Sequence, residues 1–215
     1  LESMSSSDFN KISTKDEDWK YLGKKIFELN DIEIGDTKEI QKSTNSDIDF
    51  NSFTYIVNSD KKHVNITNIN DISEPLINDS VRRPFDKFNI EQFEKVTGGF
   101  RIDFQDDLDE YYTVNFQSDQ NAIPYIGVSV EKNKTAKLYL NLNGSVKGNV
   151  YPIIELSLKE NSNLEIIISV TSQEDVNIAN SIYAKVLKDA NLKIHTISMG
   201  GELSRSRIDI DLIGD

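Results

Sequence analysis

The sequence predicts a mainly β protein whose short strands stack into a parallel solenoid. From Gly98 onward, alternating apolar and polar runs follow one another, and turn residues separate them without an intervening helical stripe. The segments "SVEKNKTAKLYLNL", "SLKENSNLEIIISV" and "VLKDANLKIHTISM" share one arrangement: a strand end, a charged or Asn-containing turn, and a new strand opened by leucine. These leucines, Leu138, Leu164 and Leu192, are 26 and 28 residues apart, and Tyr112 lies 26 residues before Leu138.

This repeat indicates coils of about 26–28 residues with two strands each. One such coil cannot bury its apolar face alone, so we expect stacked coils joined by ladders of parallel strands. An antiparallel sandwich also has a strand about every 8–12 residues, but the recurring turn favours the solenoid. The expected strands cover residues 100–104, 111–116, 125–130, 136–142, 150–158, 164–170, 178–187, 192–198 and 207–213.

An N-terminal region, residues 1–97, is expected to precede the β-helix core at 98–215. Its first element is a helix at about 14–29, because Thr14 and Glu17 have the spacing of a capping box. Trp19, Leu22, Ile26 and Leu29 form one apolar stripe on this helix.

The rest of this region contains weaker signals. Two alternating runs, 53–57 and 63–69, flank a turn-rich Asn-Ser-Asp sequence and predict a small hairpin at about 53–69. The stretch that follows, with Pro75 and Pro84, is expected to be a connector with one short helix near residues 89–96.

Composition excludes several classes of function. The chain has 215 residues and no cysteine, so disulfides, thiolate metal sites and a cysteine nucleophile are absent. Its net charge of −12 disfavours nucleic acid and anionic membranes as partners. No apolar stretch is long enough to cross a bilayer, and the first residues do not have the pattern of a signal peptide. We therefore expect a cytoplasmic protein.

Few residues are candidates for chemistry. His63 and His195 do not share metal-ligand spacing, and both are expected to be structural or solvated. The acidic stretches "QDDLDE" (105–110) and "RIDIDL" (207–212) could supply paired carboxylates or calcium ligands, as in a β-helical lyase or glycosidase that acts on polysaccharides. Strict alternation instead predicts that Asp209, Asp211 and Arg207 share a solvated outer face. Ser204 and Ser206 have no base partner in the sequence.

Three stretches of the chain resemble the SufB/SufD family of iron–sulfur cluster assembly proteins. "DEDWKYL", with Glu17, Trp19 and Tyr21, is similar to the entry helix of the SufD branch, and "YIVNSD" to a strand and turn of the family. The closest stretch is "GGELSRSRIDIDLIGD", which matches the family's Gly-Gly-x-Leu-x-Arg…Gly pattern at Gly200, Gly201, Leu203, Arg205 and Gly214.

The resemblance implies a right-handed parallel β-helix that serves as a scaffold without enzymatic activity. It implies pairing through the β-helix with a SufB-like subunit or a second copy, and binding of a SufC-like ABC ATPase through a C-terminal part that follows the stretch present here. No metal or cofactor residue is assigned, because an iron–sulfur cluster would be handled by the whole complex. Gly200 and Gly201 are expected at a tight corner, where Arg205 could donate hydrogen bonds to carbonyl groups.

Overall fold

The computed structural model describes residues 41–43, 54–57, 64–68, 76, 87–96, 98–118, 121–144, 149–171 and 177–214. The expected helix at 14–29, with Trp19 and Tyr21, lies outside these residues, as does His63. The described residues form two six-stranded sheets and one helix, α1 (Lys87–Glu94), which confirms the short helix expected near 89–96.

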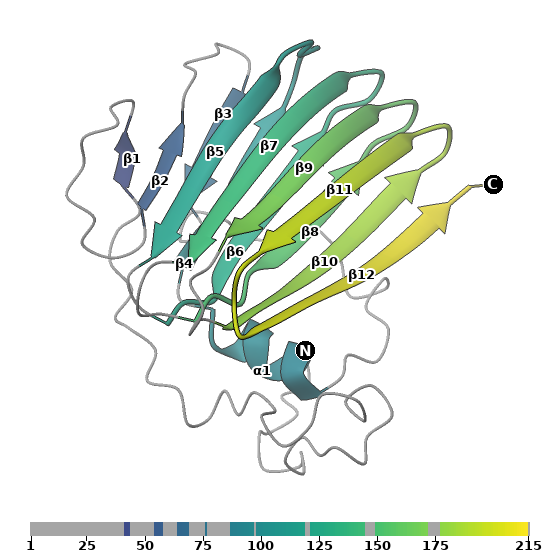
Figure 1. Ribbon diagram of the computed structural model, residues 1–215. Helices are drawn as coiled ribbons and strands as arrows, with labels where there is room; N and C mark the ends of the chain where they lie inside the picture. The colour runs from purple at the N-terminus through teal and green to yellow at the C-terminus, as the bar shows by residue number, and fades with distance from the viewer. Residues whose placement is uncertain are drawn as a thin grey trace.

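From β4 to β12 successive strands alternate between the two sheets, so that each coil contributes one strand to each sheet (Figure 1). Sheet A contains, in spatial order, β1 (Gln41–Ser43), β2 (Thr54–Val57), β5 (Tyr111–Ser118), β7 (Thr135–Gly144), β9 (Asn163–Thr171) and β11 (Asn191–Met199). Sheet B contains β12 (Leu203–Ile213), β10 (Asn177–Leu187), β8 (Ile153–Leu158), β6 (Pro124–Val130), β4 (Gly98–Phe104) and β3 (Val64–Asn68).

All neighbouring strands from β4 to β12 are parallel within their sheets, which confirms the predicted solenoid and rules out the sandwich. The predicted alignment is confirmed for Tyr112 opposite Leu138 and for Leu164 opposite Leu192, and it is wrong between β7 and β9. Leu138 lies opposite Ile166, and Leu164 lies opposite Ala136. A shift of two residues keeps every side chain on the same face, so the apolar pattern could not distinguish the two registers.

The predicted hairpin at 53–69 is wrong, although both of its strands exist. β2 belongs to sheet A and pairs antiparallel with β5, whereas β3 belongs to sheet B and pairs antiparallel with β4. A two-stranded hairpin in water is only marginally stable, and each strand gains more by extending a sheet that already has a buried face. β2 and β3 cover the first edges of the two parallel ladders. Each runs antiparallel to the ladder strand beside it.

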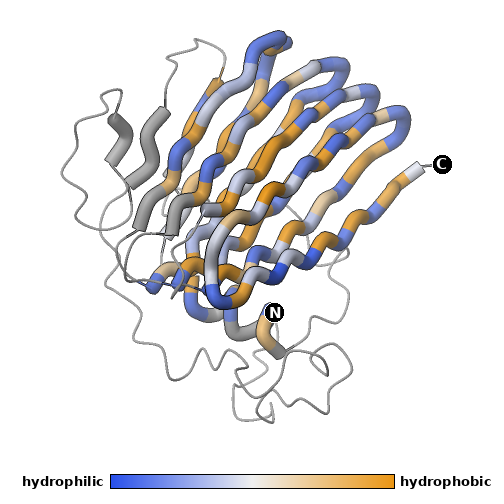
Figure 2. Tube along the Cα trace, in the orientation of Figure 1, coloured by the Kyte–Doolittle hydropathy of each residue, from blue (hydrophilic) through white to orange (hydrophobic). Residues whose placement is uncertain are grey.

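The hydrophobic core lies between the two sheets. Residues of alternating hydropathy follow each strand (Figure 2), and the apolar side chains of one face of each sheet point inward. Sheet A contributes columns such as Val114, Leu140 and Ile168, and sheet B contributes Ile102, Val128 and Leu156; all six are fully buried.

The three turns that join β6 to β7, β8 to β9 and β10 to β11 each contain a residue in the left-handed conformation. Asn133, Asn161 and Asp189 have φ angles of 60°, 56° and 57°, a conformation that Asn and Asp tolerate better than most residues. The Asn161 side-chain amide also donates a hydrogen bond of 2.8 Å to Asn133 Oδ1. Lys132 pairs with Glu160 of the next coil and lowers the pKa of that carboxyl group. Turn chemistry therefore sets the stacking of consecutive coils.

Helix α1 packs on the outer face of sheet B through a closed polar network. Asn89 Nδ2 and Ser181 Oγ are 2.7 Å apart, and the Ser181 hydroxyl donates to Gln92 Oε1 at 2.7 Å. Gln92 Nε2 donates to the carbonyls of Tyr151 and Ala179 at 3.1 and 3.3 Å. Because Asn89, Gln92 and Ser181 are fully buried, this network satisfies polar groups that would otherwise destabilise the fold.

The register can be tested by disulfide formation, since the chain has no native cysteine. Tyr139 and Ile167 lie opposite each other on the outer face of sheet A. We expect Tyr139→Cys with Ile167→Cys to form a disulfide under mild oxidation, because opposite Cα atoms are about 5 Å apart. Tyr139→Cys with Glu165→Cys should stay reduced, because the diagonal separation is about 8 Å. The reverse result on a non-reducing gel would support the register with Leu138 opposite Leu164.

Candidate functional site

The corner between β11 and β12 is the most distinctive feature that the sequence singled out. Gly200 and Gly201 have φ angles of 81° and 84°, a region that residues with a Cβ rarely adopt. The two glycines therefore allow the chain to turn from sheet A to sheet B within a short loop. Leu203 opens β12 directly after this corner and lies opposite Asn177.

Both arginines that follow the corner contact helix α1. The Arg205 guanidinium lies 5.9 Å from the centre of the Phe88 ring, a distance compatible with a cation–π interaction. Arg207 Nη1 donates a hydrogen bond of 3.1 Å to Asn89 Oδ1. Two side chains thus fix β12, the strand after the corner, to helix α1. Hydrogen bonds from Arg205 to carbonyl groups stay a prediction.

The acidic stretch of β12 has the arrangement that its alternation predicts. Asp209 Oδ2 accepts a hydrogen bond of 2.8 Å from Arg207 Nε on the outer face, and Asp211 lies opposite Lys185. The alternate residues Ile208, Ile210 and Leu212 lie opposite the buried core residues Ile182, Ala184 and Val186.

The acidic turn at 105–110 takes part in coil stacking. Asp106 accepts a hydrogen bond of 3.1 Å from Lys134 Nζ, and Asp107 accepts one of 2.8 Å from the backbone N–H of Thr135. These contacts raise the pKa of Lys134, chiefly through the hydrogen bond to Asp106. No group of three or more His, Asp or Glu side chains in the described part of the chain could hold a metal ion.

The remaining candidates of the sequence are exposed. His195 points outward from β11, opposite Ile167, as predicted. Ser204 and Ser206 are exposed on β12. Gly214 follows that strand, and a Cβ added there would meet no atom within 4 Å.

A buried tyrosine–carboxylate pair that the sequence did not predict lies on the outer face of sheet B. The Tyr125 hydroxyl donates a hydrogen bond of 2.6 Å to Glu155 Oε2, and Glu155 is 1% exposed. Burial, followed by the charge of Glu155, raises the pKa of Tyr125 far above its usual value. Tyr125 and Glu155 are on neighbouring strands but not opposite each other, so no sequence spacing pointed to this contact.

The last coil leaves one end of the core open. Within the described residues, β11 pairs only with β9 and β12 only with β10. Ile208, Ile210 and Leu212 are 41%, 46% and 78% exposed although they continue inward-facing columns. Among the described residues this end combines two strand edges without a neighbour and exposed apolar side chains, features that a further strand of the same chain or of another would cover.

Comparison with known proteins identifies the family. Residues 112–215 match the model of the SufBD core domain, which is described as SUF system FeS cluster assembly. Residues 112–215 are thus a SufBD core domain, the core of the SufB/SufD family. The SufBD core begins at Tyr112 on β5 and includes the Gly200–Gly201 corner and all of β12. No curated protein and no solved structure matches the chain. Among the residues that the structure describes, no helix is long and apolar enough to cross a membrane.

Proposed function

We propose that this protein is a non-enzymatic scaffold subunit of a Suf-type iron–sulfur cluster assembly complex. The observation that carries the proposal is the SufBD core match over eight consecutive strands, β5 to β12, of an uninterrupted solenoid. Three of the acidic residues that could have served an enzyme, Asp106, Asp107 and Asp209, instead pair with Lys134, a backbone N–H and Arg207. These pairs support a structural role for them.

We propose that the chain pairs with a SufB-like subunit or with a second copy through its β-helix, at the edges of β11 and β12. The free edges of β11 and β12 can accept a further strand from a partner, and Ile208, Ile210 and Leu212 would become buried. A SufC-like ABC ATPase would join the complex through the SufB-like subunit and through a C-terminal part that follows the stretch present here. The likeness of "DEDWKYL" favours the SufD role within such a complex, and a cytoplasmic location stays a prediction.

Co-expression tests this proposal. The tagged chain is produced with a SufB-like subunit and a SufC-like ATPase from the same source and purified at moderate salt. We expect both proteins to co-purify with the wild-type chain. Failure of both to co-purify with a chain that is folded by circular dichroism would contradict the proposal.

A pair of variants locates the contact. Leu212→Asp places a charge at the open end, where the wild-type side chain is 78% exposed, so the fold should tolerate it. We expect recovery of the SufB-like subunit to fall by about tenfold, since a buried unpaired charge costs well over the 1.4 kcal/mol that a factor of ten requires. Leu212→Ala is the matched control and should retain most of the partner. Equal recovery of the SufB-like subunit with Leu212→Asp and Leu212→Ala would mean that this subunit binds another surface of the chain.

A further inference from the structure

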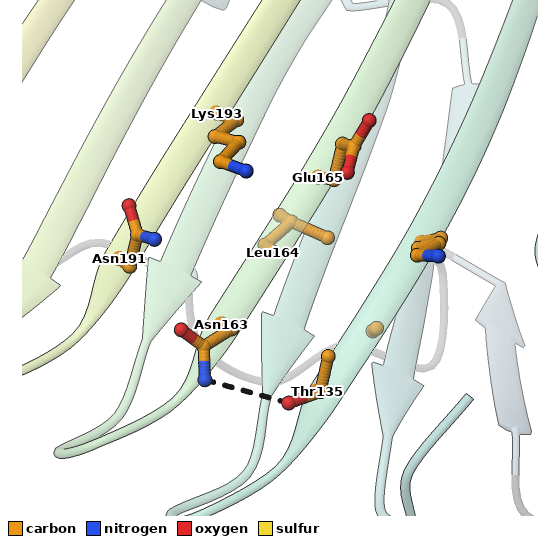
Figure 3. A pocket seen from close by; sticks show the side chains of 8 residues that line it. Thr135, Asn163, Leu164, Glu165, Asn191 and Lys193 are labelled. Carbon is orange, nitrogen blue, oxygen red and sulfur yellow. Dashed lines mark hydrogen bonds between the residues drawn. The ribbon is translucent and has the colours of Figure 1, made fainter. Parts of the chain in front are cut away.

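A pocket on the outer face of sheet A is built from equivalent positions of three successive coils (Figure 3). Thr135, Asn163 and Asn191 form one column across β7, β9 and β11, and Lys137, Glu165 and Lys193 form the next. The volume is about 200 Å³. Pockets for drug-sized ligands and cofactors are larger, roughly 300–1,000 Å³. This pocket therefore suits one or two side chains rather than a nucleotide or a flavin.

The single carboxylate of the pocket already has a partner. Tyr111 lies opposite Lys137, but its hydroxyl reaches across β7 and donates a hydrogen bond of 2.7 Å to Glu165 Oε1. This hydrogen bond is the main reason why the pKa of Glu165 is lowered, and the charges of Lys193 and Lys137 lower it further. Glu165 thus stays ionised, and Tyr111 rather than a lysine is the donor bound to it.

The donors of the pocket remain available. Neither Lys137 nor Lys193 forms an ion pair or side-chain hydrogen bond with any residue that the structure describes, and the same is true of the Asn191 side chain. The pocket contains two ammonium groups and one amide, but only one carboxylate, to which Tyr111 already donates a hydrogen bond. It therefore has an excess of hydrogen-bond donors and of positive charge. In a chain with a net charge of −12, this local excess favours a carboxylate as ligand.

Apolar side chains continue the same face along β11. Ile197 and Met199 are 47% and 55% exposed and point to the same side as Lys193, beyond His195. The distance from Lys193 to Ile197 along the strand is about 13 Å, four residues at about 3.3 Å each. Methionine is enriched in protein interfaces, and exposed apolar side chains next to polar residues are a feature of interaction sites.

We propose that this surface, the lysine face (Lys137, Glu165, Lys193, Ile197 and Met199), binds an acidic segment of a partner protein. A carboxylate of that segment occupies the pocket between Lys137 and Lys193, and apolar side chains about four residues away cover Ile197 and Met199. The lysine face lies on the outer surface of sheet A, and the open end of the core is formed by inward-facing residues of β12. The inference does not depend on the proposed pairing at the open end.

The test uses a peptide with the expected spacing. The isotope-labelled chain is titrated with acetyl-Glu-Ser-Glu-Ser-Leu-Ser-Leu-amide and followed by amide NMR. We expect shifts confined to residues 135–137, 163–165 and 191–199. A peptide with Gln in place of Glu should bind about tenfold more weakly, since two exposed charge pairs contribute about 1 kcal/mol each at most and 1.4 kcal/mol corresponds to a factor of ten.

Variants of the chain separate the site from general charge. Lys137→Gln combined with Lys193→Gln should weaken the peptide by about tenfold by the same reasoning. Lys188→Gln removes the charge of an exposed turn lysine outside the pocket and should leave binding unchanged. Equal binding of the Gln peptide, equal binding by the double variant, or shifts on other strands would overturn the proposal. If free glutarate binds as tightly as the peptide, the ligand is a small dicarboxylate and the proposal of a protein partner is wrong.

Discussion

Replacing Gly99 with alanine is expected to lower the free energy of unfolding by about 3 kcal/mol or more. Gly99 lies opposite Tyr125 at the start of β4, and a Cβ at this position would be 2.0 Å from the Tyr125 carbonyl oxygen. That oxygen is backbone, so β4 and β6 would have to move apart and lose ladder hydrogen bonds. Urea unfolding followed by circular dichroism measures the change.

Two other glycines are matched controls for Gly99→Ala. At Gly127 an added Cβ would be 3.3 Å from Cε1 of the Tyr125 ring, a side-chain atom that can shift, so Gly127→Ala should be milder. At Gly214 no atom lies within 4 Å, so Gly214→Ala should be nearly neutral. Equal losses at Gly99 and Gly214 would contradict the described packing of β4 on β6.

Replacing Phe104 with alanine is expected to cost about 3–5 kcal/mol. Phe104 is fully buried between the sheets, where its ring packs edge-on against Tyr112 with centroids 5.9 Å apart. The substitution leaves a cavity where β4 and β5, one from each sheet, meet at the end of a coil. Thermal and urea unfolding of the variant measure the loss.

Phe93→Ala is the control for the position of the core. Phe93 lies on α1, is only partly buried, and its ring centre is 5.8 Å from that of Tyr183 on the outer face of sheet B. Its removal should cost about 1–2 kcal/mol, because less apolar area returns to water. A larger loss for Phe93→Ala than for Phe104→Ala would mean that the helix layer, and not the space between the sheets, holds the main core.

Alternation of apolar and polar residues was sufficient to predict the strands of the core. It predicted every strand from β4 to β12 because an inward face of two packed sheets must be apolar at every second position. The strand expected at 150–158 begins at Ile153, since Pro152 has no N–H to donate, and Val150 forms only two isolated bridges, with Ala122 and Ile178.

Register and tertiary contacts could not be predicted in the same way. The leucine alignment was wrong only between β7 and β9, where the spacing of coils in sheet A changes from 26 to 28 residues without changing which face is apolar. The signal that could have corrected it is the turn residue in the left-handed conformation, which recurs at Asn133, Asn161 and Asp189.

The candidate sites were predicted only in part for a similar reason. The outward direction of Asp209 and Asp211 followed from local alternation. The contact of Tyr125 with Glu155, the network from Asn89 to Ser181, and the lysine face each depend on residues from different coils. Their sequence separations have meaning only after the register is known.

The central claim is that this protein supports iron–sulfur cluster assembly as a scaffold subunit. The most direct measurement is cluster formation, as iron and sulfide content and visible absorbance, in a reconstitution of the SufB-like and SufC-like partners with an iron salt and a sulfide source. We expect the wild-type chain to raise the cluster content of the complex, Leu212→Asp to fail to do so, and the chain alone to acquire no cluster. Cluster formation that is unchanged by the wild-type chain, or a cluster on the chain alone, would contradict the claim.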